Sequence, residues 1–474
     1  MLSSVAAPVA AAQTPDATSV YAAYLRDIRF ADLPQHVVAA TKRSIFDTLG
    51  VMLAGSGPET AANRLVREVA RWGGTPEASV IGHPLRLPAV HAGFVNGAMA
   101  HQYDFDDTHD AAVAHPTANT LAAGLAVAQS IGNVSGAELI RAIALGSDIV
   151  CRLGLAIQGS LYEYPWTRPP IIGIWGATAT ASALLQLPSD AIESAFGFTL
   201  HQTGNTLECL YAAGSEVRGL RDGFSVRNGI TAALMARAGI RGDRTALEGR
   251  FGLFHAFFRG EYDRSALVDE LGSRFEGASV SIKPWPSARE THATIRCVLE
   301  LKANHGVSAE AIDDVHLFVG RTNLEFCEPA DARRKPAAKM DALSSLPFAV
   351  AVALHHGGVP LSAYTSEALT DPAILALARR VTWEVDDERS RDGSIEGARV
   401  VITLADGRKI SHSVRHGLGH PDDPLPEEAV VRKFRDCARM ATRPPGDEAI
   451  DRLHRVVQDL EHRSVEDLAA ALPA

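Results

Sequence analysis

The chain has 474 residues, of which 46% are hydrophobic and 22% charged, and its formal net charge is −10 at pH 7. This composition is ordinary for a globular protein, and the length allows two or three domains with a large core. The negative charge argues against non-specific binding of nucleic acid, although a cleft in an acidic protein can still be basic. The five cysteines are far apart and include no CxxC pair, so they offer neither a disulfide framework nor a zinc site.

Residues 1–16 are expected to form a disordered tail. The alanine-rich stretch from Met1 to Ala12 lacks the basic region that precedes the apolar run of a signal peptide. Elsewhere no apolar run reaches the ~20 residues that span a bilayer. Together with widely spaced cysteines, these features predict a cytoplasmic protein that binds neither membranes nor nucleic acid.

Residues 17–268 have the pattern of an alanine-rich helical domain. Ser135 is a favourable N-cap because Glu138 follows three residues later, as in a capping box. A short strand is predicted over Ser79–Gly82. The main helices are predicted over residues 34–54, 59–72, 90–103, 118–131, 136–157, 171–185, 189–197 and 224–238.

Residues 269–421 have a mixed pattern that predicts a second domain of α+β type. Its hairpin is the clearest element, since Asp406-Gly407 is a strong turn signal between two strands. From residue 422 to 474 the helical pattern returns, and this segment is expected to rejoin the first domain. The predicted strands span residues 278–282, 312–319, 380–385, 400–404 and 409–414, and the predicted helices span residues 288–304, 342–355, 374–378, 430–440 and 448–460.

The stretch NGAMAHQYDFDDTHD, from residue 96 to 110, places acids, a threonine and histidines directly after small apolar residues. If the helix predicted over Val90–Tyr103 runs one turn further, His101, Asp104 and Thr108 share one helical face. His115-Pro116 then breaks the chain before the next helix. This arrangement suits proton transfer at a polar substrate. The alternative is a solvated helix cap in which neighbouring aspartates accept backbone N–H groups.

Two arginines follow in the stretch GSEVRGLRDG, before a predicted amphipathic helix. Glycines let backbone amides approach a ligand, and a helix N-terminus favours negative charge, so Arg218 and Arg221 form a plausible anion site. The alternative is a structural clasp in which these arginines pair with Glu216 and Asp222. The residues alone favour neither interpretation.

The segment KPWPSARETH places Lys283 at the end of a predicted strand and Arg289 and His292 on the following helix. Prolines that hold a cation rigidly are suited to a carboxylate clamp between domains. The alternative is a surface turn with a solvated lysine, and we favour the clamp.

These motifs occur in the order of the MmgE/PrpD family, which the chain resembles over nearly its whole length after the tail. The resemblance rests on NGAMAHQYDFDDTH followed by HPT, on EVRGLRDGFSVRNG, on KPWPSARETH and on KMDALSSLPFAVAVAL. The family includes 2-methylcitrate dehydratase, cis-aconitate decarboxylase and iminodisuccinate epimerase. It implies a mainly α fold, in which a large all-helical domain of N- and C-terminal parts carries an inserted α+β lid. It also implies an active site between these domains, no metal or organic cofactor, and a homodimer.

By this resemblance, Asp104, Thr108 and His115 match the active-site aspartate, threonine and histidine of the family, and Lys283 matches the lysine of the lid. Arg218 stands where the decarboxylase has a lysine, and Arg168 where the family often has a histidine before proline. The spacing from Thr108 to His115 is also one residue longer than expected in the decarboxylase. These departures weaken the expectation of cis-aconitate decarboxylation, and they keep or increase positive charge in the pocket.

We therefore expect a cofactor-independent lyase or isomerase that abstracts a proton next to a carboxylate of a small di- or tricarboxylate, as 2-methylcitrate dehydratase does. Alternatives are an isomerase like iminodisuccinate epimerase and a non-catalytic member that binds a carboxylate. His115 is the expected base, with Asp104 to orient it or act as partner acid. The expected catalytic residues are His115, Asp104 and Lys283, and the expected substrate-binding residues are Thr108, Arg218, Arg289, His101 and Arg168.

A third enzymatic alternative comes from Asp106 to Asp110, which fit the DDxxD motif of helical prenyl and terpene synthases. That chemistry requires aspartates on facing helices to bridge magnesium ions. The other acid pair of note, Asp386-Asp387, follows a predicted strand in the other domain, so this alternative is weak.

Overall fold

In the computed structural model, residues 14–159, 163–388, 395 and 397–473 are described. Most of the tail predicted over residues 1–16 lies outside the described residues. Asp16 does not belong to such a tail, because its carboxylate accepts the N–H of Thr18 and caps the first helix, α1 (Ala17–Asp27).

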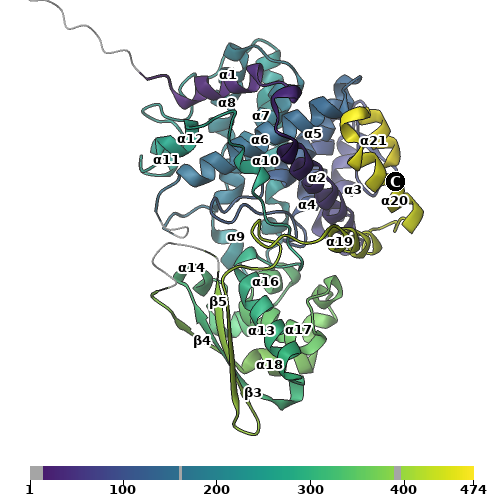
Figure 1. The fold of residues 1–474 in the computed structure, drawn as a ribbon. Coiled ribbons are helices and arrows are strands. Elements are labelled where there is room, and N and C mark those ends of the chain that lie inside the picture. The colour runs from purple at the N-terminus through teal and green to yellow at the C-terminus, as the bar shows by residue number, and fades with distance from the viewer. Residues whose placement is uncertain (1–13, 160–162, 389–394, 396, 474) are drawn as a thin grey trace, which may run out of the picture.

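The larger of two bodies is built from helices, and we call it the helical body (Figure 1). Residues from both ends of the chain share one hydrophobic cluster in it. Besides α1, its helices are α2 (Gln35–Gly55), α3 (Ala61–Val69), α4 (Ala89–Ala100), α5 (Pro116–Ile131), α6 (Gly136–Ala156), α7 (Arg168–Leu184), α8 (Ser189–Gln202), α9 (Glu208–Tyr211), α10 (Val217–Arg237), α11 (Leu253–Phe257), α12 (Arg264–Val268), α19 (Glu427–Arg439), α20 (Asp447–Gln458) and α21 (Val465–Ala471). A short hairpin of β1 (Ala78–Ser79) and β2 (Arg86–Leu87) adjoins them.

The C-terminal helices pack against N-terminal ones, as the returning helical pattern predicted (Figure 1). The aromatic rings of Phe46 in α2 and Phe434 in α19 stack with their centroids 4.4 Å apart. A Cβ atom at Gly50 would lie 2.8 Å from the Phe434 ring, so the small residue permits this close approach. The mainly α fold class is confirmed.

The second body, which we call the mixed body, packs helices against a four-stranded sheet in the order β4-β3-β5-β6. Strands β3 and β4 are parallel, and the other pairs are antiparallel. Gly407 has φ 84° in the turn between β5 and β6, which confirms the predicted hairpin. The strands are β3 (Ile312–Val319), β4 (Val381–Val385), β5 (Ala398–Leu404) and β6 (Lys409–Val414), and the helices are α13 (His292–His305), α14 (Arg321–Leu324), α15 (Ala330–Arg334), α16 (Lys339–Leu343), α17 (Leu346–His356) and α18 (Pro372–Arg379).

The mixed body has a hydrophobic cluster of its own. Ile282 and Leu425 still belong to the cluster of the helical body, whereas Ala288 belongs to that of the mixed body. Domain boundaries at residues 268/269 and 421/422, and a lid function for the mixed body, stay predictions.

Four predicted elements are wrong. Helix α10 begins at Val217 and not at residue 224, so Arg218 and Arg221 lie within the helix and not in a turn before it. Helix α4 ends at Ala100 and does not continue through Tyr103, because His101, with φ −108° and ψ 10°, already leaves the helical conformation; Asp104 follows with φ 46°. The strand predicted over residues 278–282 is absent; Ser281 instead forms an isolated antiparallel bridge with Thr108. The helix predicted over residues 342–355 is divided at Ser345. The hydroxyl of Ser345 accepts the N–H of Phe348 and thereby caps the start of α17.

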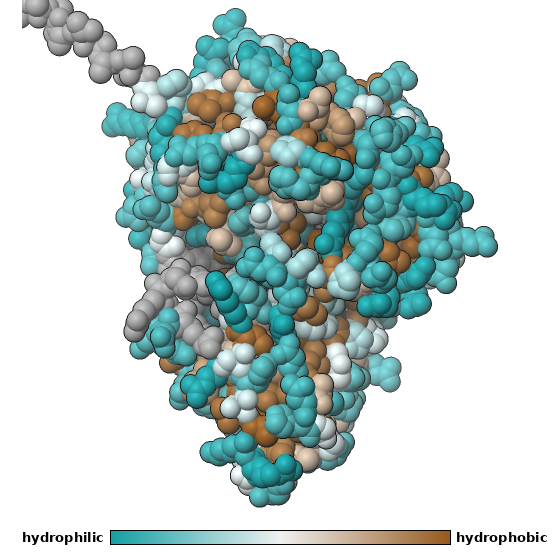
Figure 2. All heavy atoms as spheres, viewed as in Figure 1, coloured by the Kyte–Doolittle hydropathy of each residue, from teal (hydrophilic) through white to brown (hydrophobic). Residues whose placement is uncertain are grey.

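The surface shown in Figure 2 is largely hydrophilic where the C-terminal helices lie. Within the described residues, no helix combines the length and the apolar character that crossing a membrane requires.

Candidate active site

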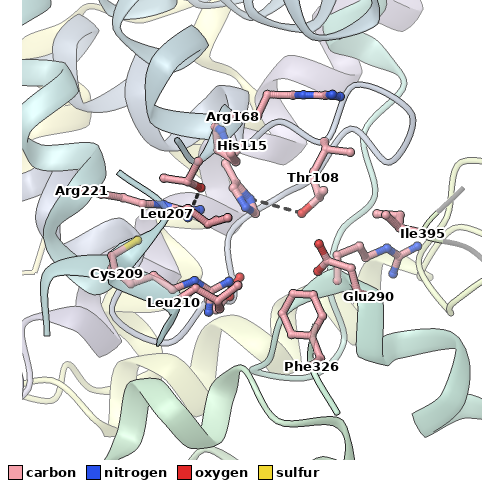
Figure 3. A pocket seen from close by; sticks show the side chains of 16 residues that line it. Thr108, His115, Arg168, Leu207, Cys209, Leu210, Arg221, Glu290, Phe326 and Ile395 are labelled. Carbon is pink, nitrogen blue, oxygen red and sulfur yellow. Dashed lines mark hydrogen bonds and ion pairs between the residues drawn. The ribbon is translucent and has the colours of Figure 1, made fainter. Parts of the chain in front are cut away.

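A cavity lies where the two bodies meet, and side chains of both bodies line it (Figure 3). Its empty volume, including the open mouth, is about 580 Å³. The lining residues are Asp104, Thr108, Val113, His115, Thr167, Arg168, Pro169, Leu207, Cys209, Leu210, Arg218 and Arg221 from the helical body, and Arg289, Glu290, Phe326 and Ile395 from the other side.

Positive charge dominates this lining. It includes four arginines, which are Arg168, Arg218, Arg221 and Arg289, against two acids, Asp104 and Glu290. Guanidinium groups match the geometry of carboxylates, so the cavity is suited to a small anion with carboxylate groups.

Three long helices begin at the wall of the cavity. His115 is the residue before α5, Arg168 is the first residue of α7, and Arg218 lies in the first turn of α10. Backbone N–H groups at a helix start lack partners within the helix, and the helix dipole places partial positive charge there. The helix ends therefore favour the same ligand charge as the arginines.

Asp104 is the centre of a buried ion-pair network. Its carboxylate lies 2.6 Å from Nζ of Lys283 and 2.7 Å from a guanidinium nitrogen of Arg218. Burial alone would raise the pKa of Asp104, but Arg218 and Lys283 outweigh it and hold the pKa well below its ordinary value. Asp104 is thus an ionised anchor that fixes two cations, and it is not available as an acid.

Lys283 also donates a hydrogen bond to the backbone carbonyl of Asp104, at 2.8 Å, and its side chain is fully buried. The alternative of a solvated surface turn is therefore wrong. Lys283 lies behind the cavity wall, where it holds Asp104 in place, and does not line the cavity itself.

His115 is a neutral histidine in the cavity wall. Its Nδ1 lies 2.9 Å from the backbone carbonyl of Asp107, and a carbonyl oxygen only accepts, so Nδ1 carries the proton. The Nε2 atom then has a free lone pair. Burial is the main cause that lowers the pKa of His115 to about 3, although nearby Asp106 opposes it. The side chain is consequently an unprotonated base at neutral pH.

Asp106 links His115 to a second buried histidine. Its carboxylate lies 2.9 Å from Nδ1 of His101 and 3.4 Å from Nδ1 of His115. The predicted orienting residue for His115 was Asp104, but Asp106 holds this position. A carboxylate here stabilises the imidazolium that forms when His115 takes a proton. His101 is fully buried and does not line the cavity, so it supports the site from behind.

The loop that carries these residues is joined to the segment leading into the mixed body. Thr108 and Ser281 exchange two backbone hydrogen bonds of 3.0 and 2.7 Å. Two residues further along, Asp110 accepts hydrogen bonds from the guanidinium group of Arg289 at 2.9 Å and from the hydroxyl of Ser281 at 2.7 Å. Arg289 lines the cavity with its charge already matched by Asp110.

The DDxxD motif does not form a magnesium-pyrophosphate site of the synthase type. It lies in the loop after α4, and its carboxylates have separate partners: His101 for Asp106, Thr117 for Asp107 and Arg289 for Asp110. Aspartates that bridge metal ions must instead converge on the ligand.

Two groups of side chains in the described part of the chain have ligand atoms close enough to hold a metal ion. One consists of His101, Asp106 and His115, whose ligand atoms lie within 4.8 Å of one another, and the other of His416, His420 and Asp422. In the first group, Nδ1 of His101 is hydrogen-bonded to the Asp106 carboxylate, and Nδ1 of His115 lies 3.4 Å from the same carboxylate.

The structure brings the predicted site residues into one neighbourhood. His101 and Lys283 lie behind the cavity wall. The other six line the cavity, and they are Asp104, Thr108, His115, Arg168, Arg218 and Arg289. Arg218 pairs with Asp104, whereas Glu216 pairs with Arg64, so the predicted clasp between Arg218 and Glu216 is wrong. Arg221 does contact Asp222, at 3.5 Å, and lines the cavity as well.

Sequence reasoning missed Glu290 and the apolar part of the lining. Glu290 stands inside the KPWPSARETH motif next to Arg289, and this neighbouring charge was the one available signal. Cys209, Phe326 and Ile395 come from segments without a recognisable motif, and only the fold brings them to the cavity.

The fold and the site together define the class of this protein, which is an enzyme with a helical body, a mixed body and a cation-rich cavity between them. Residues 20–265 match the family model of the MmgE/PrpD N-terminal domain, and residues 285–459 match that of the MmgE/PrpD C-terminal domain. The chain belongs to the MmgE/PrpD family, and its enzyme class is that of an MmgE/PrpD-type lyase.

Individual relatives are similar over almost the full length. The cis-aconitate decarboxylase of Homo sapiens is 25% identical over 462 residues, which cover 94% of this chain and 93% of that protein. The cis-aconitate decarboxylase-like protein oryM of Aspergillus oryzae is 25% identical over 92% of this chain and 93% of its own length. The 2-methylcitrate dehydratase of Cupriavidus necator is 24% identical over 90% of each chain. The similarity therefore extends over both bodies.

Proposed function

We propose that the protein is a cofactor-independent lyase or isomerase that removes a proton next to a carboxylate of a small di- or tricarboxylate. The reaction that we favour is a dehydration like that of 2-methylcitrate. The observation that carries the proposal is a neutral histidine, His115, in the wall of a cavity that four arginines line. Such a cavity binds the anion and offers a base at the same place.

In the proposed reaction, Nε2 of His115 takes the proton from the carbon beside a substrate carboxylate. The negative charge that develops on that carboxylate is stabilised by preorganised guanidinium groups, with Arg218 held in place by Asp104. The imidazolium of His115 is stabilised by Asp106. Thr108, whose hydroxyl lies 3.3 Å from Nδ1 of His115, is placed to hold the substrate next to the base.

Two alternatives share this site. An isomerase like iminodisuccinate epimerase would return the proton to the opposite face of the same carbon, and a non-catalytic member would bind the carboxylate without proton removal. We favour turnover because His115 lines the cavity as an unprotonated side chain, where a bound carboxylate can meet it.

The test is incubation of the purified protein in D₂O with 2-methylcitrate, citrate, cis-aconitate or iminodisuccinate, followed by NMR. We expect deuterium beside a carboxylate or a new alkene signal with at least one of them. A general base contributes roughly 10²–10⁴-fold to rate, so His115→Ala should lose activity by that factor. His201→Ala, which changes an exposed histidine paired with Asp243, is the matched control and should be fully active.

A chelator arm tests the absence of a metal requirement, which we propose together with the reaction. Activity should be unchanged by EDTA, although the ligand atoms of His101, Asp106 and His115 lie close together. Loss of activity with EDTA and its return with a divalent metal would overturn a cofactor-independent mechanism. Binding of a tricarboxylate without exchange, unchanged in His115→Ala, would favour the non-catalytic alternative.

We also propose that the protein is a cytoplasmic homodimer. The homodimer follows from the family resemblance, and the cytoplasmic location from the widely spaced cysteines. Light scattering after gel filtration tests the homodimer. A mass of one chain at micromolar concentration would contradict it.

A further inference from the structure

Glu290 is an acid inside an otherwise cationic cavity. It lies in a single 3-10 turn (Arg289–Thr291) directly before α13, and 8% of the residue is exposed. In Figure 3 its carboxyl group points into the cavity from the side of the mixed body, toward the wall that carries His115 and Thr108. The base and this acid therefore stand on opposing walls, and a small substrate in the cavity lies between them.

The carboxyl group of Glu290 has no side-chain partner among the described residues. Its backbone is fixed, because Asn323 donates a hydrogen bond of 2.8 Å to its carbonyl oxygen. The neighbouring Arg289 is directed away to Asp110. Apart from its own backbone N–H, no described group donates to the carboxyl. The carboxyl group faces the cavity, so its partner there is water or a bound ligand.

Of the two acids that line the cavity, Glu290 is the one whose pKa is raised. Burial raises its pKa, and nearby Asp104 raises it further, while its own backbone N–H, Arg218 and Lys283 oppose this in part. Asp104 has its pKa shifted the other way by direct ion pairs with two cations. An ionised Glu290 would repel an anionic substrate, whereas a protonated Glu290 admits it and presents an O–H donor.

We infer that Glu290 is the general acid of a dehydration, which donates its proton to the hydroxyl group that leaves. His115 removes the proton from the carbon beside a carboxylate, and the electron pair of that C–H bond forms the new C=C bond. The C–O bond on the adjacent carbon breaks, and the hydroxyl departs as water with the proton of Glu290. The inference rests on the proposed function and narrows it to the dehydration of a hydroxy acid.

The competing explanation is that Glu290 only stabilises the fold, because the helix dipole favours an acid near the N-terminus of a helix, here α13. A leaving group that departs without protonation separates the two explanations. Glu290→Gln is compared with wild type on 2-methylcitrate and on 2-chlorobutane-1,2,3-tricarboxylate, in which chlorine replaces the hydroxyl. Glu300→Gln is the matched control, since Glu300 lies in α13 and pairs with Arg296 and His412.

We expect Glu290→Gln to dehydrate 2-methylcitrate about 10²–10⁴-fold more slowly than wild type, as for other general acids. Elimination of chloride should stay close to the wild-type rate, and Glu300→Gln should be active on both. The wild-type rate should also fall on the alkaline side, where Glu290 loses its proton, and Glu290→Gln should lack this limb. Circular dichroism and thermal unfolding verify that the variants are folded.

An equal loss of rate on both substrates would overturn the inference, because it would mean that Glu290 only places the substrate. Dehydration at the wild-type rate by Glu290→Gln would overturn it as well. If wild type exchanges the proton of iminodisuccinate but dehydrates neither 2-methylcitrate nor citrate, the proposed function survives and the role of Glu290 does not. Inactivity of wild type on all four compounds of the D₂O experiment removes both.

Discussion

Two buried lysines make nearly the same contacts, and only one of them supports the cavity. Nζ of Lys283 lies 2.6 Å from the carboxylate of Asp104 and 2.8 Å from its carbonyl oxygen. Nζ of Lys433 in α19 lies 2.7 Å from the carboxylate of Asp47 and 2.8 Å from the carbonyl oxygen of Phe105. Replacement of each lysine by methionine keeps the side-chain length and removes the charge. Comparison of the two variants therefore distinguishes an effect on unfolding free energy from an effect on turnover.

Removal of one partner from a buried ion pair leaves an uncompensated charge and costs about 3–5 kcal/mol of unfolding free energy. In Lys283→Met, Asp104 keeps its 2.7 Å contact with Arg218, so we expect a loss of about 3 kcal/mol, at the lower end of that range. In Lys433→Met, the described residues contain no second salt bridge to Asp47, so we expect about 4–5 kcal/mol. Chemical unfolding followed by circular dichroism measures both values.

Turnover should follow the opposite order. Without Lys283, the pair of Asp104 and Arg218 is no longer fixed to the segment that leads into the mixed body. A preorganised electrostatic group is worth about 10²–10³-fold in rate. We therefore expect Lys283→Met to lose that factor and Lys433→Met to stay near wild type. The reasoning is refuted if both variants lose the same turnover, or if Lys283→Met unfolds at the same denaturant concentration as wild type.

Two further predictions concern His115 and Arg218. His115 has a folded pKa of about 3 against an ordinary value of 6.5, so below pH 6.5 the unfolded chain binds a proton that the folded chain refuses, and stability falls with falling pH. Between pH 7 and pH 5 wild type should lose about 2 kcal/mol more unfolding free energy than His115→Asn, and parallel stability curves for the two proteins would contradict this. Arg218→Met should raise KM for the substrate about tenfold or more, because a hydrogen bond to a charged group contributes about 1.5–3 kcal/mol. Arg218→Lys should recover most of that loss in steady-state kinetics, whereas an unchanged KM in Arg218→Met would remove Arg218 from substrate binding.

Periodic and capped elements could be predicted from the sequence. The helices that became α2, α5, α6, α7, α19 and α20 begin and end within about three residues of the predicted bounds, since apolar spacing and caps such as Ser135 are local signals. The hairpin at Gly407 was predictable for the same reason. These elements depend on contacts within one helix or between neighbouring strands.

The loop after α4 could not be predicted in this way. Its sequence continues a helical pattern, but the helix ends at Ala100 and Asp104 has a left-handed backbone. The carboxylate of Asp104 pairs with Lys283 and Arg218, which come from distant parts of the chain. Family motifs pointed to residues that lie in or behind one cavity, but not to their arrangement. We predicted that Asp104 orients His115 or acts as its partner acid, whereas in the fold the carboxylate of Asp106 lies next to Nδ1 of His115.

The same long-range bonds explain why the site depends on both bodies. Asp104 and Asp110 belong to one loop of the helical body, and their cations, Lys283 and Arg289, belong to the segment that leads into the mixed body. Because Glu290 follows Arg289 directly, the pairing that docks the two bodies also sets the distance between the acid on one wall and His115 on the other. A variant that weakens the pair of Asp110 and Arg289 should therefore act on both proposed catalytic groups at once, although neither Asp110 nor Arg289 is proposed to exchange a proton with the substrate.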